Sequence, residues 1–313
     1  MDLNIDSITS FLVSVMIAGT PLLFATLGEL ITEKAGHLNL GVEGMMLMGA
    51  IAGFAFAGTT GNPILALVAA MVAGGLSALI YGFLTISLRS NQVVTGLALT
   101  IFGTGLSSYI GTAYVGQKIP TNVVDFFKPI EIPLLSKIPL LGPVFFNQDI
   151  MVYAAFILAL IMGIYLHHTR QGLNLKAVGE NPSAADGAGI HIGLYKYIHI
   201  LIGGALCGLG GAYLSVVEVP VWQDKITGGR GWIAIALVIF CKWSPYKALF
   251  AAYLFGGLSI VGLRLQHLSV PTELWTALPY IFTILVLIIS SVRQSKENEA
   301  PKGLSIPYFR EER

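Results

Sequence analysis

The sequence predicts an all-α polytopic membrane protein with about nine transmembrane helices, within a range of eight to ten. Only 11% of its 313 residues are charged, against roughly 25% in soluble domains, while 55% are hydrophobic and the mean hydropathy is +0.75. Runs without Asp, Glu, Lys or Arg reach the roughly 20 residues that a membrane-spanning helix needs. They are 7–28, 44–88, 90–117, 150–169, 197–217 and 274–292. This pattern excludes a cytosolic enzyme, a secreted disulfide-stabilised domain and a nucleic-acid binder.

Nine spans follow from these runs in chain order. The uncharged run 44–88 is too long for one helix and divides at residues 59–63 (Thr-Thr-Gly-Asn-Pro), a turn cluster that places proline at the start of the next helix. The predicted spans are 8–31, 38–57, 64–88, 92–114, 150–168, 194–217, 231–243, 248–265 and 275–292. Tryptophans flank several of them, as interfacial anchors do. These are Trp222, Trp232, Trp243 and Trp275.

The chain is expected to form a single transmembrane domain, residues 1–313, in which three longer segments lie outside the spans. Residues 115–148 contain five prolines and predict a structured external loop. Residues 169–193 form a polar loop, and the basic tail 293–313 is expected to be mobile. With nine spans, 12 of the 18 Lys and Arg residues fall on the side of that loop and tail. The positive-inside rule therefore makes both cytoplasmic and places the N-terminus outside.

The loop 169–193 contains the most informative motif. Asn181 is a good N-cap residue and Pro182 is favoured at the first helical position. Gly187 and Gly189 end the helix after about two turns. One face of this helix carries small side chains, from Ala184, Ala185 and Ala188. The helix is either an ordinary connector or a docking element that a cytoplasmic partner grips.

Three segments together resemble the permeases of ATP-binding-cassette (ABC) importers that handle ribose and other simple sugars, nucleosides and branched-chain amino acids. Residues 170–190 resemble the coupling loop of these permeases (R-x-G-x6-G-x-N-x2-A-A-x3-G-I). Residues 28–45 and the run 229–240, with Trp243 and Pro245 after it, resemble two further family segments. The resemblance covers essentially the whole chain. The Leu-Gly-Val-Glu-Gly form at 40–44 is most similar to the nucleoside and simple-sugar branch.

This resemblance implies a transport subunit, not an enzyme, that moves nucleosides or related simple sugars across the cell membrane by alternating access. It implies separate ATP-binding subunits, a second permease subunit (a paralogue or a copy), an extracytoplasmic substrate-binding protein, and no cofactor or metal. The coupling residues are then Gly179, Asn181, Pro182, Ala184, Ala185 and Gly189. The sequence itself supports one of these implications. It contains no Gly-Lys dipeptide and therefore no Walker A loop. ATP hydrolysis is therefore expected in a partner chain.

Polar residues near the first two spans are candidates for the pathway or its gate. Glu29 lies near the end of the first span, and Asn39 and Glu43 lie at the start of the second. The glycines around them favour a broken or re-entrant helix, and an ionisable group within a membrane is expensive unless it has a role or a partner. The alternative is structural: Glu29 and Glu43 cap helix ends and pair with Lys34 or another subunit.

Three alternatives to a nucleoside permease remain. A branched-chain amino-acid permease is the alternative within the same family. A secondary carrier would need acidic residues in mid-span, and the third to ninth spans contain almost none. A membrane-embedded enzyme would need a polar catalytic cluster, and no residues have suitable spacing for one. Cys207 and Cys241 fall inside apolar runs and are expected to be small buried side chains.

Overall fold

The computed structural model describes residues 5–264, 272–292 and 300–310, and nearly all of its regular structure is helical. Six helices in this part of the chain are long and apolar enough to cross a membrane. They are α1 (Ile5–Lys34), α2 (Val42–Thr60), α3 (Pro63–Gly82) with η1 (Phe83–Ser87), α4 (Gln92–Gly111) with η2 (Thr112–Tyr114), α7 (Ile150–His168) and α10 (Ile192–Ala212) with η4 (Tyr213–Glu218). The remaining long helices are α11 (Arg230–Phe240), α12 (Pro245–Arg264) and α13 (Thr272–Val292). Each predicted span matches one of these helices, which confirms the all-α membrane fold.

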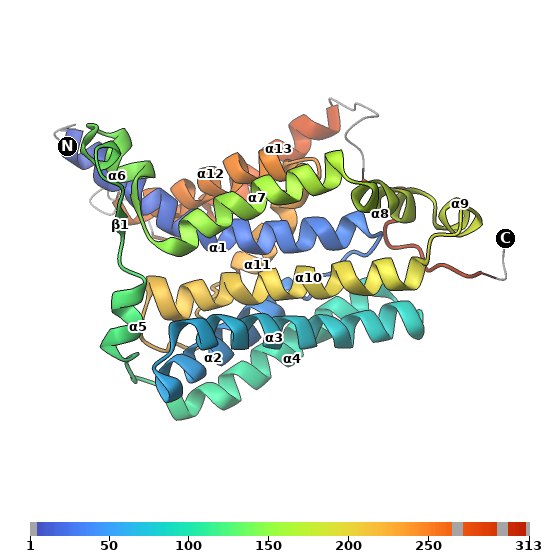
Figure 1. Cartoon of the computed structure of the whole chain (residues 1–313), viewed down its shortest axis with the longest axis horizontal. Helices are drawn as coiled ribbons and strands as arrows, with labels where there is room; N and C mark the ends of the chain where they lie inside the picture. The colour runs from blue at the N-terminus through green and yellow to red at the C-terminus, as the bar shows by residue number, and fades with distance from the viewer. Residues whose placement is uncertain (1–4, 265–271, 293–299, 311–313) are drawn as a thin grey trace.

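The long helices lie roughly along one axis of the molecule (Figure 1). The N-terminus lies at one end, beside the segment that joins α4 to α7. That segment contains α5 (Thr121–Phe126), β1 (Ile130–Glu131), η3 (Leu135–Lys137), α6 (Leu141–Phe145) and β2 (Asn147–Gln148), with β1 antiparallel to β2. The C-terminus lies at the other end, beside α8 (Arg170–Glu180) and α9 (Pro182–Gly187). We refer to these as the α5 end and the α9 end.

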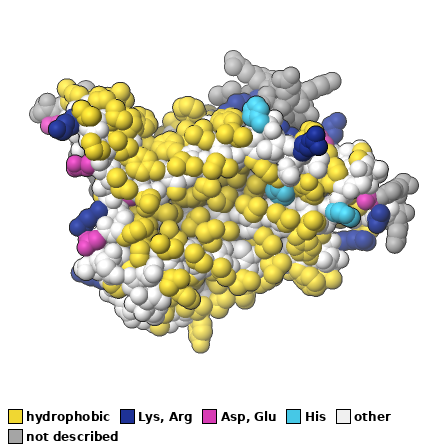
Figure 2. Space-filling model, in the orientation of Figure 1, with side chains coloured by type: hydrophobic (Ala, Val, Ile, Leu, Met, Phe, Trp, Pro, Cys, Tyr) yellow, Lys and Arg dark blue, Asp and Glu magenta, His cyan; other side chains and the backbone are white. Residues whose placement is uncertain are grey.

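Charged side chains gather at these two ends, and a broad band of hydrophobic side chains separates them (Figure 2). Large apolar residues are exposed along the band, among them Val72 on α3, Ile101 on α4 and Ile161 on α7. Such exposure would be costly in water, whereas lipid chains are as apolar as these side chains. The bilayer therefore covers the middle of the molecule, and the N-terminus and α9 lie on opposite sides, as the five spans between them require.

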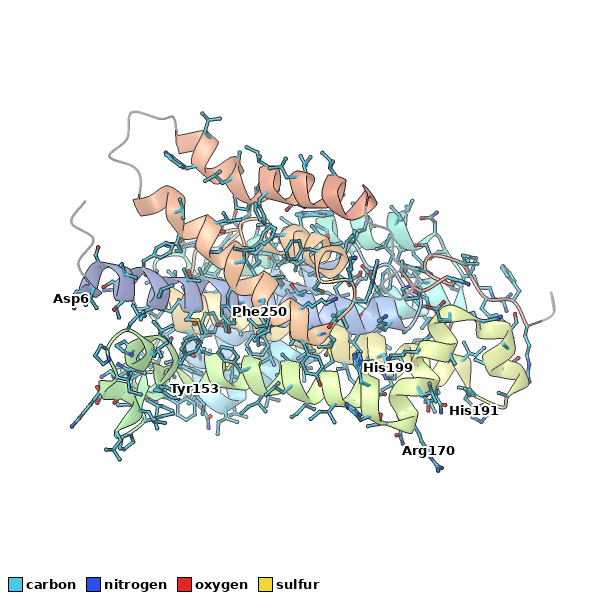
Figure 3. The ribbon with its side chains drawn as sticks, turned by 90° about the horizontal axis from the view of Figure 1, so that it is seen from above. Asp6, Tyr153, Arg170, His191, His199 and Phe250 are labelled. Atoms are coloured by element: carbon cyan, nitrogen blue, oxygen red, sulfur yellow. The ribbon has the colours of Figure 1, made fainter. Side chains whose placement is uncertain are left out.

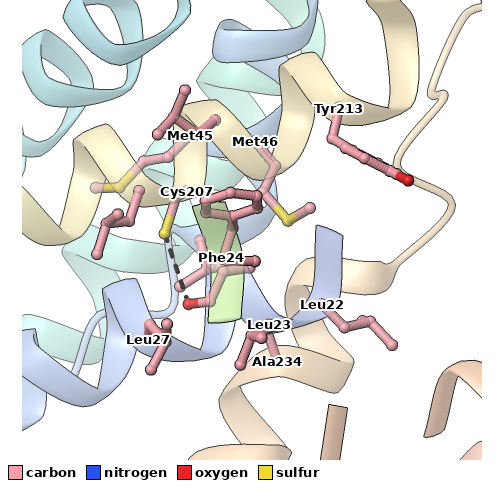
Figure 4. Close-up of a cluster of buried hydrophobic side chains, with 14 of the residues drawn as sticks. Leu22, Leu23, Phe24, Leu27, Met45, Met46, Cys207, Tyr213 and Ala234 are labelled. Atoms are coloured by element: carbon pink, nitrogen blue, oxygen red, sulfur yellow. Dashed lines mark hydrogen bonds between the residues drawn. The ribbon is translucent and has the colours of Figure 1, made fainter. Parts of the chain in front are cut away.

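Helix α10 lies at the centre of the bundle and packs against α1, α2 and α3. Its core neighbours include Phe24 and Met46 (Figure 4), and the thiol of Cys207 points to the carbonyl oxygen of Ala25 at 3.9 Å. Cys207 and Cys241 are both buried and free, as predicted. Towards the α9 end, His199 on α10 contacts the Tyr165 hydroxyl of α7 through Nε2 at 2.7 Å (Figure 3).

Glycines permit the close approach of α10 to α2 and α3. A Cβ atom on Gly208 would overlap the carbonyl oxygen of Ala70, and one on Gly49 would overlap the backbone of Gly208. The obstacles are backbone atoms and cannot move aside as a flexible side chain could. The small-residue contacts that the 36 glycines favour are therefore present here, and Gly44 with Gly103 forms a similar one between α2 and α4.

Replacing Gly208 with Ala is expected to force α10 away from α3. Overpacking of this kind costs about 1–3 kcal/mol. The apparent melting temperature (Tm) of the purified permease in detergent should therefore fall by several degrees. Gly105→Ala is the matched control, because a Cβ atom at Gly105 on α4 meets no atom within 4 Å. Equal losses in the two variants would contradict the proposed contact.

Two tryptophans are buried, so the prediction of interfacial anchors is wrong for them. Trp222 is 2% exposed and packs against Gly111 and the Phe54 ring, with 5.8 Å between ring centroids. Trp243 is 8% exposed, and its indole nitrogen donates to Glu33 at 2.5 Å. Each ring fills a site created by a residue far away in the sequence, and hydropathy does not show such a site.

Candidate functional site

The first candidate site is the elbow, residues 35–41, which connects α1 to α2. The predicted second span begins too early, because α2 starts at Val42 and not at residue 38. Gly36 has a φ of +84°, a conformation that suits glycine, and the Asn39 side chain accepts the backbone N–H of Gly41 at 2.9 Å. These turns interrupt the helix, so the predicted break is present.

Side chains from three helices hold the elbow. Glu29 of α1 accepts the backbone N–H of Asn39 at 2.8 Å. Gln92 of α4 accepts the N–H of Leu38 at 2.8 Å, and the Tyr81 hydroxyl of α3 donates to the carbonyl of Leu38 at 2.7 Å. Glu29 is fully buried and Asn39 nearly so. These two predicted residues are therefore in contact, as parts of the support of the elbow.

Glu43, the third predicted gate residue, joins two helix N-termini. It lies in the first turn of α2, and its Oε1 accepts the Thr227 hydroxyl at 2.5 Å and the N–H of Gly229 at 2.9 Å. Its Oε2 accepts the N–H of Gly231 at 2.6 Å. Gly228 and Gly229 have φ values of +55° and +83°, so glycine at these positions lets the chain turn into α11.

One carboxylate thus serves both helices. The N–H groups of Gly229 and Gly231, at the start of α11, would otherwise lack partners. The negative charge also lies at the positive ends of two helix dipoles. This geometry agrees with the interpretation of Glu43 as a cap. The predicted pairing with Lys34 is absent, because within the described residues Lys34 forms no ion pair with Glu29 or Glu43.

The junction of α2 and α11 lies deep in the bundle. The Thr100 hydroxyl, near the middle of α4, donates to the carbonyl of Leu40 at 2.8 Å, so the elbow reaches half-way along α4. The segment 219–229 approaches from the α5 end, where Asp224 accepts the Ser108 hydroxyl at 2.6 Å. Two chain segments therefore enter from opposite ends and meet at Glu43, a geometry typical of membrane transporters with broken helices.

One further buried acid, Glu33, is not among the residues that the sequence analysis identified. Glu33 is 1% exposed and lies one helical turn after Glu29 on α1. Glu29 Oε2 and Glu33 Oε1 have no hydrogen-bond partner within the described residues. The spacing of four residues at the end of an apolar helix is a signal that could have identified the pair.

The second candidate site is the coupling loop, formed by α8 and α9. The Asn181 side chain accepts the N–H of Ala184 at 3.0 Å and Pro182 is the first residue of α9, which confirms the predicted start of this helix. Helix α9 ends at Gly187, and Gly189 follows with a φ of +82°. A Cβ atom on Gly179 would overlap the carbonyl oxygen of Lys34, so the loop sits directly on the end of α1.

The predicted small face of α9 is divided in two. Ala184 and Ala188 are exposed. Ala185 is 3% exposed and packs in a cluster with Val178, Ile192 and Tyr308. The expectation that the three alanines share one face is therefore wrong, because consecutive helical positions such as Ala184 and Ala185 differ by about 100°, and Ala188 follows the end of α9.

The C-terminal tail covers the buried side of α9. The Tyr308 hydroxyl donates to Asp186 at 2.7 Å, and Arg310 forms an ion pair with the same carboxylate at 3.2 Å. The N–H of Gly303 donates to the Gly179 carbonyl at 2.8 Å. The prediction of a mobile tail is therefore wrong for residues 300–310, while residues 293–299 and 311–313 lie outside the described residues.

Comparison with known proteins identifies relatives along most of the chain. The family described as the permease component of the branched-chain amino acid transport system matches residues 11–287. "Putative glucose ABC transporter permease protein TsgC13" of Haloferax volcanii is 39% identical over 94% of this chain and 95% of its own. Guanosine ABC transporter permease protein NupQ of Bacillus subtilis is 35% identical over 99% of this chain and 100% of its own. The guanosine permease NupP of the same organism is 27% identical over 87% of this chain and 78% of its own.

A solved structure supports the fold. It is described as "An inward-facing conformation of a putative metal-chelate type ABC transporter", and it matches with a TM-score of 0.52. The match covers 89% of this chain and 85% of the other at 14% sequence identity. At this identity the similarity concerns the arrangement of helices alone.

Proposed function

The chain belongs to the family of permease components of branched-chain amino acid transport systems, and from this premise we propose that it carries nucleosides, or related simple sugars, across the cell membrane. It is a multi-pass permease of an ABC importer, a transport subunit rather than an enzyme. The observation that carries the proposal of substrate is its similarity, over nearly the full length of both chains, to a permease named for guanosine. A branched-chain amino-acid substrate is the alternative within the family.

The proposal includes three kinds of partner. A family member of this kind works with ATP-binding subunits, and this chain contains no Walker A loop. A second, unlike permease subunit is supported by the similarity of this chain to two guanosine permeases of one organism. In this proposal the α9 end lies in the cytoplasm, as the positive-inside rule predicts, and an extracytoplasmic binding protein delivers the substrate at the α5 end.

A continuous series of contacts supports a coupling role for α9. The coupling loop rests on the end of α1 through Gly179 and Lys34. Glu29 of α1 holds the elbow, and the elbow leads into Glu43, which binds the start of α11. A displacement of α9 by an ATP-driven partner would thus reach the junction of the two broken helices. In this proposal Glu29, Asn39 and Glu43 shape the gate by holding backbone, with no need to contact the substrate.

Competition for uptake tests the substrate. Cells or proteoliposomes that contain the full transporter would be supplied with labelled guanosine and a large excess of unlabelled uridine, ribose, glucose or leucine. We expect a nucleoside or a sugar to reduce uptake and leucine to have no effect. If leucine is itself transported and the nucleosides and sugars are not, the branched-chain alternative is correct. Uptake that persists with ATP after the ion gradients are collapsed would separate this protein from a secondary carrier.

A further inference from the structure

A cavity of about 600 Å³ lies at the α9 end, beside the contact of the tail with α9. Its walls come from the elbow at His37, from η1 and the turn after it, from the segment 186–196 that leads from α9 into α10, and from the tail at residues 307–310. Figure 3 labels His191, one of its lining residues, close to α9. Segments from four parts of the chain therefore enclose one space.

The lining of this cavity is rich in positive charge. Arg89, Lys196 and Arg310 contribute to it, together with His37 and His191. The one acidic residue among those that line it is Asp186, which already binds Arg310 and the Tyr308 hydroxyl. Within the described residues, Arg89 and Lys196 form no ion pair. Two cations thus lack a counter-charge.

Lys196 is the first observation that points to a ligand. Its side chain is 97% buried, because its exposed fraction is 3%, and it has no hydrogen-bond partner among the described residues. Lys196 lines the cavity, so its ammonium has access to the contents of this space, and a cation in such a site is unfavourable without a partner. Close to it, His37 is 1% exposed and neither ring nitrogen has a partner in the described part of the chain. Burial and the positive charge of Lys196 hold the pKa of His37 well below its ordinary value.

The N-terminus of α10 is the second observation. This helix has 21 residues, and its N-cap residue His191 offers no side-chain cap. Ile192, Gly193 and Leu194, which carry the first N–H groups of α10, all line the cavity. An uncapped helix start presents free N–H donors and a positive dipole end, and both favour an anion.

We propose that this cavity binds a phosphate-bearing anion, held by Arg89, Lys196 and the first N–H groups of α10. Several donors that converge on one space match the several acceptor oxygens of a phosphate group. Basic pockets between helices at a membrane surface bind phospholipid headgroups. Leu194 is 58% exposed and Phe83 of the adjacent η1 is 52% exposed, so an acyl chain has apolar surface beside the rim. The anion is either an anionic phospholipid headgroup or a soluble phosphate.

Thermal unfolding of the purified full-length permease in a neutral detergent tests the site and separates the two sources. The additions are dioctanoyl phosphatidylglycerol, inorganic phosphate and, as a control, dioctanoyl phosphatidylcholine. A ligand that occupies the site should raise Tm by about 3 °C or more at saturation. A shift with phosphatidylglycerol alone identifies a lipid headgroup, and a shift with inorganic phosphate identifies a soluble anion.

Two variants and a control assign the shift to this cavity. Lys196→Met nearly keeps the volume of the side chain. Arg89→Gln changes an exposed residue whose guanidinium lies over the Phe309 ring, 4.5 Å from its centroid. Each should lose most of the shift, whereas Arg170→Gln, which removes an exposed cation at the same end but outside the cavity, should keep it. The proposal is overturned if neither anion shifts Tm, or if Arg89→Gln retains the full wild-type shift.

Discussion

Ala184→Arg is expected to abolish uptake while the permease still folds and reaches the membrane. Ala184 lies on the exposed side of α9, and its side chain contributes nothing to the core of the permease. If an ATP-binding subunit grips this helix, a long charged side chain there would prevent close seating. We expect the affinity for the ATP-binding subunit to fall tenfold or more, which corresponds to about 1.4 kcal/mol or more. A steric clash at the centre of an interface readily costs this much.

The measurement is uptake of labelled substrate together with ATP hydrolysis by the assembled complex. Ala184→Ser is the matched control and should transport normally, because it stays small. Ala185→Asp offers a contrast at the next position. It would bury a carboxylate among Val178, Ile192 and Tyr308. It should therefore lower the amount of folded permease, whereas Ala184→Arg should leave the permease folded and separate uptake from ATP hydrolysis. Normal uptake by Ala184→Arg would show that α9 is not the docking helix.

The helices of this fold could be predicted because lipid imposes a length on them. Helix α7 illustrates this, since the predicted span 150–168 and the observed Ile150–His168 agree at both ends. Asp149 caps its start by accepting the N–H groups of Met151 and Val152, at 2.8 and 3.0 Å. Local capping chemistry and apolar length act together here, and both can be recognised in the sequence.

The start of α2 could not be predicted in the same way. Residues 38–41 lie just before the uncharged run 44–88, but Glu29, Tyr81 and Gln92 bind the backbone at residues 38 and 39 from elsewhere in the chain. Sequence patterns describe neighbours along a helix and contain no information on which distant side chain will compete for a backbone group. The sequence therefore predicts a break between the first two spans, but it places the start of α2 four residues too early.

Both candidate sites contain features that depend on neighbouring residues and features that depend on residues far away in the sequence. The capped start of α9 depends on Asn181 and Pro182 alone, so local rules identified it. The burial of Ala185 depends on Tyr308 in the tail, and the role of Glu43 depends on residues 227–231, more than 180 positions away. The run Gly228-Gly229-Arg230-Gly231 is typical of a turn, but nothing in it indicates which carboxylate it binds.

Glu43→Gln is expected to destabilise the whole permease. The amide keeps one oxygen, which can accept from Thr227 and Gly229, but its NH₂ group then faces the N–H of Gly231. Two donors in contact cannot bond, and hydrogen bonds to a charged group contribute about 1.5–3 kcal/mol each. Loss of one such bond, weakening of the others and a donor left unpaired in the interior together predict a loss of about 3 kcal/mol or more. Thermal unfolding in detergent should show a drop in Tm of several degrees.

Glu131→Gln is the matched control, because Glu131 is exposed on β1 and should tolerate the same chemical change. The pair of variants also separates the two roles considered for Glu43. If the carboxylate holds α2 against α11, stability and uptake fall together in Glu43→Gln, and Thr227→Val shows a smaller version of the same defect. If Glu43→Gln melts with the control but fails to transport, the carboxylate acts on the substrate or its pathway. The proposal that the Glu43 carboxylate holds α2 against α11 would then be wrong. The close contact of Gly231 with the backbone of Glu43 would have to hold the two helices together.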